Sequence, residues 1–328
     1  MKLATLKNGA RDGRLAVVSR DLTCAVHAGH IAQTLLDAVE RWSAVEAPLA
    51  DLYSTLNEGK AEGIFNFDPR LVMAPMPRCF QWLDGSAFAN HGALMERAFD
   101  TGIKNEYETY PLMYQGASDD FIGPYDNIEL PSELDNMDFE AEIAVIADEV
   151  PMGTSRDEMS THVKLLMLVN DISLRALAVR EMKTGFGWIQ AKPTTSFSPV
   201  AITPDELGQH WKSGRVELPL NVTRNGEWFG KPNAKEMTFD FYRLLEHAAY
   251  SRRLRAGTIV GSGTVSNANR AAGSCCISER RAIEMIENGE CRTPFMRFGE
   301  RVRIEMTDAT GQSLFGAIEQ KYVKHSHD

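Results

Sequence analysis

Short apolar segments alternate with polar turns over the first part of the chain. Leu3 to Lys7 and Leu15 to Val18 flank the turn Asn8-Gly9 and predict a β-hairpin or a pair of short strands. Apolar residues then recur every three or four positions, which predicts one amphipathic helix packed on a core; these residues are Ile31, Leu35, Val39 and Trp42. A polar stretch and the segment Pro75-Met76-Pro77 follow, and we place the boundary of a small N-terminal domain near residue 70.

Helical spacing occurs twice further along the chain. A capping box from Ser155 to Glu158 precedes apolar positions at helical spacing, so we predict a helix that ends near Asp171; those positions are Met159, Val163, Leu166 and Val169. The same spacing returns between Phe239 and Tyr250 and predicts a second helix.

Two hairpins are expected in the second half of the chain. Apolar positions alternate from Val216 to Val222 and lead to the turn Asn225-Gly226, after which Trp228-Phe229 begins the return strand. Val302 to Met306 and Leu314 to Ile318 flank another turn and predict the second hairpin. Strands therefore outnumber helices in the large domain.

Two carboxylates lie two positions apart within the apolar run from Asp138 to Ile146. Strand side chains alternate between faces, so Glu140 and Glu142 point the same way, and Ala144 and Ile146 indicate that this face becomes buried. Two buried like charges need a cation or a proton, because repulsion adds to the cost of desolvation. A hard divalent metal is the simplest explanation, and the alternative is an exposed strand face with two solvated glutamates.

Composition and charge restrict the classes of partner. The chain has 328 residues, 43% hydrophobic and 24% charged, which suffices for one large and one small domain. A formal net charge of −10 without a basic run argues against a nucleic-acid surface and favours a small-molecule partner. We find neither a signal-peptide core nor an apolar run of the roughly 20 residues that span a bilayer, so we expect a cytoplasmic protein that does not bind a membrane. The five cysteines lack metal-type spacing and are interpreted as free thiols.

Several short motifs, far apart in the chain, occur together in the order and spacing of one known family. They are Leu83 to His91, Phe139 to Glu142, Val169 to Arg175, Lys192, and Gly261 to Ser266. In their order and spacing the chain resembles the fumarylacetoacetate hydrolase family over roughly residues 75 to 323. The resemblance implies a β-rich α+β fold, with a mixed β-sandwich roll catalytic domain over residues 71–328 and a small N-terminal β/α domain over residues 1–70. It also implies a homodimer, in which the small domain helps dimerisation or covers the cleft.

The same resemblance implies a metal site. Its ligands would be Asp84, Glu140, Glu142 and Asp171. An all-oxygen set selects Mg²⁺, Ca²⁺ or Mn²⁺ over zinc, and the sequence does not choose among these three ions. No organic cofactor is expected.

The resemblance further implies roles for side chains around the metal. His91 has the spacing of the family's general base, and Glu279 is the candidate for its acidic partner, although residues 273–278 do not align cleanly with the family. Arg175 and Lys192 would donate to the oxyanion or to the carboxylate of the substrate, and Tyr114 and Thr264 would contact the substrate. The chain departs from the family pattern at three positions, where Ser86, Ala178 and Ala191 replace a tyrosine, a glutamine and a glycine.

These roles predict a divalent-metal-dependent hydrolase that cleaves a carbon-carbon bond of a small anionic 1,3-diketo acid. The representative reaction converts fumarylacetoacetate to fumarate and acetoacetate in the catabolism of aromatic compounds such as tyrosine. Fumarylpyruvate or acylpyruvate hydrolases, and 2-oxo-alkenoate hydratases, isomerases or decarboxylases of the same family, are alternatives, as is a dehydratase of sugar acids. His91 favours hydrolysis. A non-catalytic binding module with a purely structural metal is the alternative from another class, and would show a closed coordination shell.

Overall fold

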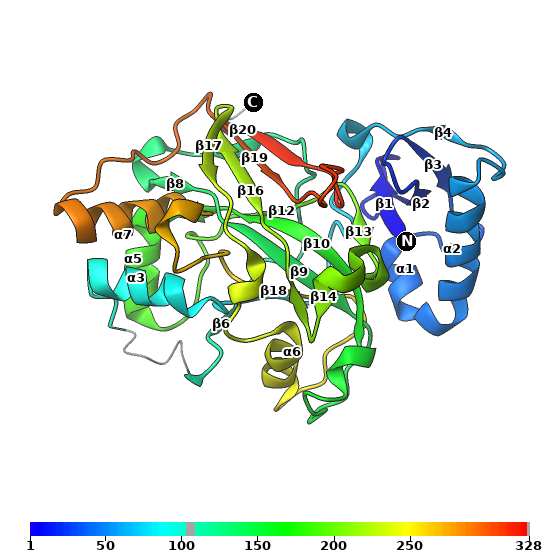
Figure 1. Cartoon of the computed structure of the whole chain (residues 1–328), viewed down its shortest axis with the longest axis horizontal. Coiled ribbons are helices and arrows are strands. Elements are labelled where there is room, and N and C mark those ends of the chain that lie inside the picture. Colours follow the sequence, from blue (N-terminus) through cyan, green and yellow to red (C-terminus); the bar gives the residue numbers. More distant parts are fainter. Residues whose placement is uncertain (103–108, 327–328) are drawn as a thin grey trace.

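The computed structural model describes residues 1–102 and 109–326. The N-terminal part, blue in Figure 1, lies at one end of the molecule and combines strands with two helices. Its elements are β1 (Lys2–Leu6), β2 (Arg14–Val18), β3 (Cys24–His27), α1 (Leu35–Glu40), α2 (Trp42–Asn57) and β4 (Phe65–Asn66). β1 and β2 pair antiparallel, so the predicted opening hairpin is confirmed.

The single helix predicted around residues 31–42 is wrong in its extent. The side chain of Thr34 caps α1, and the chain leaves helical geometry at Arg41 (φ −117°, ψ 27°) before α2 begins at Trp42. The apolar period runs through this break because both helices place their apolar faces against the same core, where Leu35, Val39 and Trp42 are buried.

An eleven-stranded sheet runs through the described part of the molecule. Its order is β4-β3-β2-β1-β13-β10-β9-β18-β5-β6, with β12 paired to β10. The further strands are β5 (Trp82–Gly85), β6 (Met113–Gly116), β9 (Ala141–Ala147), β10 (Val163–Asp171), β12 (Thr195–Phe197), β13 (Ala201–Ile202) and β18 (Thr258–Gly261). β1 pairs with β13 through Lys2 and Ile202, so the sheet continues from the N-terminal part into the large part.

A second sheet of five strands packs against this one. Its order is β17-β16-β19-β20-β7, and its strands are β7 (Ile128–Leu130), β16 (Asn221–Arg224), β17 (Glu227–Gly230), β19 (Arg301–Glu305) and β20 (Ile318–Lys324). Side chains from both sheets, such as Leu166 and Ile304, lie in one hydrophobic core. Figure 1 shows β16, β17, β19 and β20 grouped along the upper side of the molecule. The β-rich α+β sandwich is therefore confirmed.

The two late hairpins are confirmed with changed limits. β16 and β17 join at Asn225-Gly226 as predicted, but the alternating run from Val216 is divided between β15 (Arg215–Val216) and β16. β19 pairs with β20, which begins only at Ile318. Two small pairs complete the strands: β8 (Met137–Asp138) with β11 (Ser173–Leu174), and β14 (Trp211–Lys212) with β15.

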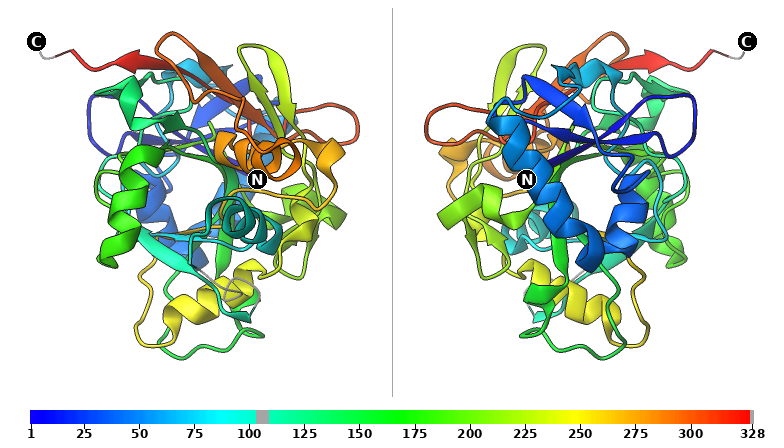
Figure 2. Two further views of the ribbon diagram at one scale, coloured as in Figure 1. Left: turned by 90° about the vertical axis from the view of Figure 1, so that its left-hand side faces the viewer. Right: turned by 90° about the vertical axis from the view of Figure 1, so that its right-hand side faces the viewer.

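Three helices gather at one end of the large sheet, at the left in Figure 1 and facing the viewer in the left panel of Figure 2. They are α3 (Ala89–Phe99), α5 (Arg175–Thr184) and α7 (Ile277–Asn288). α6 (Phe241–Ala249) confirms the helix predicted between Phe239 and Tyr250. Short 3₁₀ turns lie at Pro69–Leu71, Glu133–Asp135, Met159–Thr161, Pro204–His210, Ala234–Glu236 and Arg270–Ala272.

The helix predicted to end near Asp171 is wrong, because residues 163–171 form the strand β10. The side chain of Ser155 does bond to Glu158, 2.6 Å away, but only the short 3₁₀ turn Met159–Thr161 follows. β10 lies between β9, β12 and β13 and is buried on both faces. A strand covered on both faces has no alternation of apolar and polar residues, so its apolar run also matches helical spacing.

All five cysteines are free, as predicted. Among the described residues, no helix is long and apolar enough to cross a bilayer.

Candidate active site and metal site

Three carboxylates from three strands meet at the end of the sheet where the helices gather. Asp84 lies on β5, Glu142 on β9 and Asp171 at the end of β10, and their nearest oxygens lie within 4.8 Å of one another. Gly261 on β18 pairs with Asp84 and leaves room for its carboxylate, because a Cβ at position 261 would lie 2.3 Å from Asp84 Oδ1. Hydrogen bonding between strands thus collects residues that are far apart in the sequence.

The charges of this trio need compensation. Both oxygens of Glu142 are buried and have no hydrogen-bond partner among the described residues. Burial raises the pKa of Glu142 well above its ordinary value, and repulsion from Asp84 adds to this effect. Burial also raises the pKa of Asp84 and that of Asp171. A divalent cation would satisfy these oxygens, so the residues present fit a hard metal with carboxylate ligands.

Glu140 lies beside the trio and is held by two cations. Arg175 Nη2 is 2.6 Å from Glu140 Oε1, and Lys192 Nζ is 2.5 Å from Glu140 Oε2. Burial disfavours the ionised carboxylate, but the charges of Arg175 and Lys192 outweigh it and hold the pKa of Glu140 below its ordinary value. Lys192 also donates to Asp171, so it links Glu140 to the trio. The metal-ligand role of Glu140 stays a prediction.

His91 and Glu279 form a hydrogen-bonded pair. The ring Nδ1 of His91 in the first turn of α3 is 2.9 Å from Glu279 Oε2 in the first turn of α7. Glu279 is only 1% exposed, while the side chain of His91 is 16% exposed and reaches the edge of the site. This geometry fits a carboxylate that orients an imidazole, which is the arrangement predicted for this pair.

Tyr114 contacts one of the three carboxylates, whereas Thr264 has a buried hydroxyl without such a contact. The hydroxyl of Tyr114 donates to Asp171 Oδ2 over 2.6 Å, and its ring makes an edge contact with Trp188. Thr264 Oγ1 is buried and has no hydrogen-bond partner in the part of the chain that the structure describes. The substrate contacts of both residues stay predictions.

The sequence did not reveal the part that Asp138 plays. Its buried carboxylate accepts hydrogen bonds from Arg175 Nε (2.9 Å) and from the backbone N–H groups of Ile277 (2.8 Å) and Ser278 (3.0 Å). It thus ties Arg175 to the beginning of α7. The sequence does hold a signal for this role, because Asp138 lies two positions before Glu140 and so would point to the same face of a strand. Thr195 was also missed, and its hydroxyl donates to Asp171 Oδ1 over 3.1 Å without any sequence motif.

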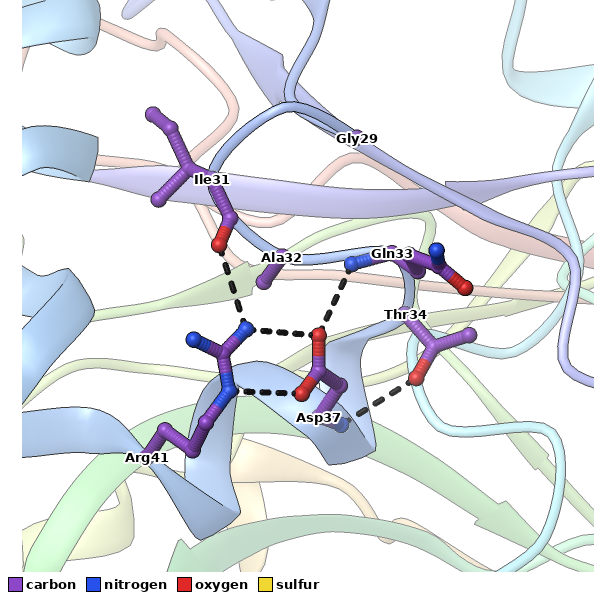
Figure 3. A pocket seen from close by; sticks show the side chains of 7 residues that line it. All are labelled: Gly29, Ile31, Ala32, Gln33, Thr34, Asp37 and Arg41. Carbon is purple, nitrogen blue, oxygen red and sulfur yellow. Dashed lines mark hydrogen bonds and ion pairs between the residues drawn. The ribbon is translucent and has the colours of Figure 1, made fainter.

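A hollow of about 430 Å³ in the N-terminal part does not add a second site. Figure 3 shows that its polar groups bond to one another: Asp37 accepts hydrogen bonds from Arg41 and from the backbone of Gln33. Arg41 also donates to the backbone oxygen of Ile31. These polar groups are therefore explained by hydrogen bonds that cap the short helix α1.

Comparison with known families shows which family the chain belongs to. The family model described as fumarylacetoacetate hydrolase C-terminal matches residues 81–322, and the model described as fumarylacetoacetase N-terminal domain 2 matches residues 1–78. The chain belongs to the fumarylacetoacetate hydrolase family.

Individual members of the family differ in activity. The chain is 30% identical to the 2,4-didehydro-3-deoxy-L-rhamnonate hydrolase of Sphingomonas sp. over 159 residues, which is 48% of this chain and 53% of the relative. It is 26% identical to the mitochondrial oxaloacetate tautomerase Fahd2a of Rattus norvegicus over 157 residues, 47% of this chain and 48% of the relative. The matched region thus spans about half the length of these curated relatives.

Solved structures of the family share the fold over the whole chain. The fumarylacetoacetate hydrolase of Exiguobacterium antarcticum superposes with a TM-score of 0.68 at 17% identity, covering 99% of this chain and 100% of that one. The maleylpyruvate hydrolase of Sphingobium sp. SYK-6, in complex with manganese(II) and pyruvate, superposes with a TM-score of 0.67 at 16% identity and the same coverage. At this identity the likeness shows the fold alone.

Proposed function

We propose that this protein is a divalent-metal-dependent hydrolase that cleaves a carbon-carbon bond of a 1,3-diketo acid such as fumarylacetoacetate, in the catabolism of aromatic compounds. The observation that carries the proposal is the His91–Glu279 pair beside three buried carboxylates. A general base next to a metal site is what water attack on a carbonyl carbon needs.

Asp84, Glu140, Glu142 and Asp171 would hold the cation; oxygens of Asp84, Glu142 and Asp171 lie within 4.8 Å of one another, and Lys192 bonds to both Glu140 and Asp171. Their oxygen donors suit Mg²⁺, Ca²⁺ or Mn²⁺, and manganese occupies the related maleylpyruvate hydrolase. When bound, the cation would polarise the ketone and stabilise the enolate that leaves.

His91 would take a proton from the attacking water through the ring nitrogen that does not face Glu279. Glu279 would accept the Nδ1–H of His91, hold the required tautomer and stabilise the imidazolium that forms. The water oxygen then bonds to the ketone carbon, and the carbon-carbon bond breaks toward the enolate. Protonation of that enolate gives the ketone product, and the other product is a carboxylic acid.

Lys192 and Arg175 would supply positive charge to the anionic substrate. Their side chains already bind carboxylates, but an ammonium has three N–H donors and a guanidinium has five, so donors remain for an oxyanion or a carboxylate. Tyr114 and Thr264 would contact the substrate through their hydroxyls. A homodimer and a small anionic substrate remain predictions.

The test is cleavage of a panel of fumarylacetoacetate, fumarylpyruvate and acylpyruvates by the intact protein and by His91→Ala, with Mg²⁺ and after chelation. We expect chelation-sensitive cleavage of at least one substrate, and a fall of about 10²- to 10⁴-fold in kcat in the variant. Unchanged cleavage by His91→Ala would remove His91 from its role as the base.

Tautomerisation or isomerisation of a 2-oxo acid is the second candidate, because a relative that is 26% identical is an oxaloacetate tautomerase. The same cation would stabilise the enolate of either reaction. The absence of cleavage by metal-loaded protein, together with metal-dependent enol-to-keto conversion of oxaloacetate, would favour this candidate.

A further inference from the structure

A second group of potential metal ligands lies next to the carboxylate trio. A ring nitrogen of His91, a carboxylate oxygen of Glu140 and Cys276 Sγ lie within 4.8 Å of one another. Cys276 precedes α7, is fully buried, and accepts the backbone N–H of Glu279 at its sulfur over 3.3 Å. The proposed hydrolysis gives this thiol no role.

The two groups differ in donor chemistry. The trio of Asp84, Glu142 and Asp171 offers only hard oxygens, whereas the second group offers nitrogen, sulfur and oxygen. Thiolate and imidazole donors select Zn²⁺ and related thiophilic ions, while carboxylates alone suit Mg²⁺, Ca²⁺ and Mn²⁺. Ligand atoms around a tetrahedral zinc are roughly 3.5 Å apart, so the distances between ligand atoms of the second group would have to shorten by up to about 1.3 Å.

We propose that His91, Glu140 and Cys276 form a second metal site that binds thiophilic dications such as Zn²⁺ and Cd²⁺, and that its occupation inhibits the enzyme. Inhibition follows because the metal takes the lone pair with which His91 would accept a proton from water. The binding stands on the geometry alone, and only the inhibition rests on the proposed hydrolysis.

The surrounding charges favour a dication at this place. Asp138, Glu140 and Glu279 lie near Cys276, as does the cation Arg175, which binds Glu140 together with Lys192. Once the thiol has ionised, the negative charges exceed the positive ones by two. Burial raises the pKa of Cys276, so the free thiol keeps its proton, and metal binding releases this proton to the solvent.

Cadmium titration of the intact, chelator-treated protein tests the site, because a cadmium–thiolate bond has its own ultraviolet charge-transfer band. The variants are Cys276→Ser and Cys275→Ser, which alter adjacent buried cysteines. We expect a saturable band in the wild type and in Cys275→Ser, and its loss in Cys276→Ser. His91→Ala should retain the band and weaken cadmium binding by roughly tenfold or more.

Asp84→Asn separates the two metal sites, because it alters the oxygen trio and should leave the cadmium–thiolate band in place. A band that persists in Cys276→Ser would overturn the proposal. If that variant does not fold, protection of Cys276 in the wild type from iodoacetamide by Cd²⁺, mapped by mass spectrometry, decides the question. Equal alkylation of Cys276 with and without Cd²⁺ would overturn the proposal as well.

Measurements of zinc inhibition distinguish the failure of this inference from the failure of the proposed function. If any substrate of the panel is cleaved, micromolar-range Zn²⁺ added to Mg²⁺-loaded protein should inhibit the wild type and Cys275→Ser far more strongly than Cys276→Ser. If no substrate is cleaved, the hydrolase proposal fails while the spectroscopic result still stands. Equal inhibition of all three proteins would overturn the inhibitory role.

Discussion

At the residue scale, Glu142 is the side chain whose surroundings most clearly favour a bound cation. Its two oxygens are buried and unpartnered among the described residues, and the nearby carboxylates Asp84 and Asp171 add repulsion. The nearby amine Lys192 donates to Glu140 and to Asp171. A buried charge without a partner costs stability, and a metal that binds only the folded state restores it.

Glu142→Gln should therefore change thermal stability in opposite ways with and without metal. In metal-free protein the neutral amide removes the cost of burying or protonating this carboxylate, whose pKa is raised, and should raise Tm. In wild-type protein, Mg²⁺ or Mn²⁺ at a hundred times its Kd should stabilise the fold by about 2.7 kcal/mol, and the variant should lose most of this gain. Calorimetry with and without metal measures both effects, with the exposed Glu227→Gln as the control. An intact metal-induced shift in Glu142→Gln would contradict the predicted ligand set.

Glu279→Gln tests the orientation of His91 with almost no change of shape. The amide can still bond to the ring, but it removes the charge that stabilises the imidazolium and can select the wrong tautomer. We expect kcat to fall by about 10²- to 10⁴-fold with KM changed much less. The exposed Glu287→Gln on the same helix is the matched control. Steady-state kinetics on a cleaved substrate would refute the role if both variants behaved alike.

At the scale of elements, the turn between α5 and β12 is held by one carboxylate. Glu181 in α5 accepts the backbone N–H groups of Ile189 (3.1 Å), Gln190 (2.8 Å) and Ala191 (3.1 Å). The next residue is Lys192, which binds Glu140 and Asp171. The last turn of a helix thus positions a cation of the site from outside.

Glu181→Gln should loosen this turn, since one amide oxygen replaces a charged carboxylate that accepts three N–H groups. We expect faster tryptic cleavage after Lys183 and a drop in kcat/KM of roughly tenfold, a limited effect because Glu181 is partly exposed and solvent screens its bonds. Lys183→Gln, an exposed change on the same helix, removes this trypsin site, and Pro193 blocks cleavage after Lys192, so this variant is the control for the kinetics alone. Unchanged cleavage and kinetics in Glu181→Gln would show that other contacts hold the turn.

At the scale of the whole molecule, the N-terminal part is joined to the rest by backbone pairing and by a buried lysine. β1 pairs with β13, and Lys2 Nζ donates to the backbone oxygen of Leu314 over 2.7 Å. Burial lowers the pKa of Lys2 from 10.5 to about 8 in the folded protein. Below that pH the fold contains a desolvated ammonium, which costs free energy relative to the unfolded chain.

This shift predicts how Lys2→Met depends on pH. Between pH 8 and 10.5 the folded chain has lost the proton while the unfolded chain keeps it, so the cost of the lysine disappears as the pH rises. The free energy of unfolding of the wild type, relative to the variant, should therefore rise by up to about 3 kcal/mol from pH 7 to pH 10.5. Urea denaturation at both pH values measures this difference, with the exposed Lys212→Met as the control. A difference that does not vary with pH would contradict the lowered pKa.

Two elements differ from the prediction because burial makes their apolar pattern ambiguous. β10 was assigned to a helix because both of its faces are buried, which erased the alternation that identifies a strand. The α1–α2 break was missed because the apolar period crosses Arg41 without interruption. The hairpin of β16 and β17 was predicted correctly, since the tight Asn225-Gly226 turn specifies both strands.

The sequence by itself determined the donors of this protein: which carboxylates, which imidazole and which cations are available, together with the hairpins and amphipathic helices that local spacing specifies. Only the tertiary structure decided that Asp84, Glu142 and Asp171 form one trio, that Glu140 is held by Arg175 and Lys192, and that Cys276 lies beside His91. The physical reason is that these contacts depend on strand pairing and helix packing between residues far apart in the chain. Such contacts form only when the whole core closes, so no local pattern encodes them.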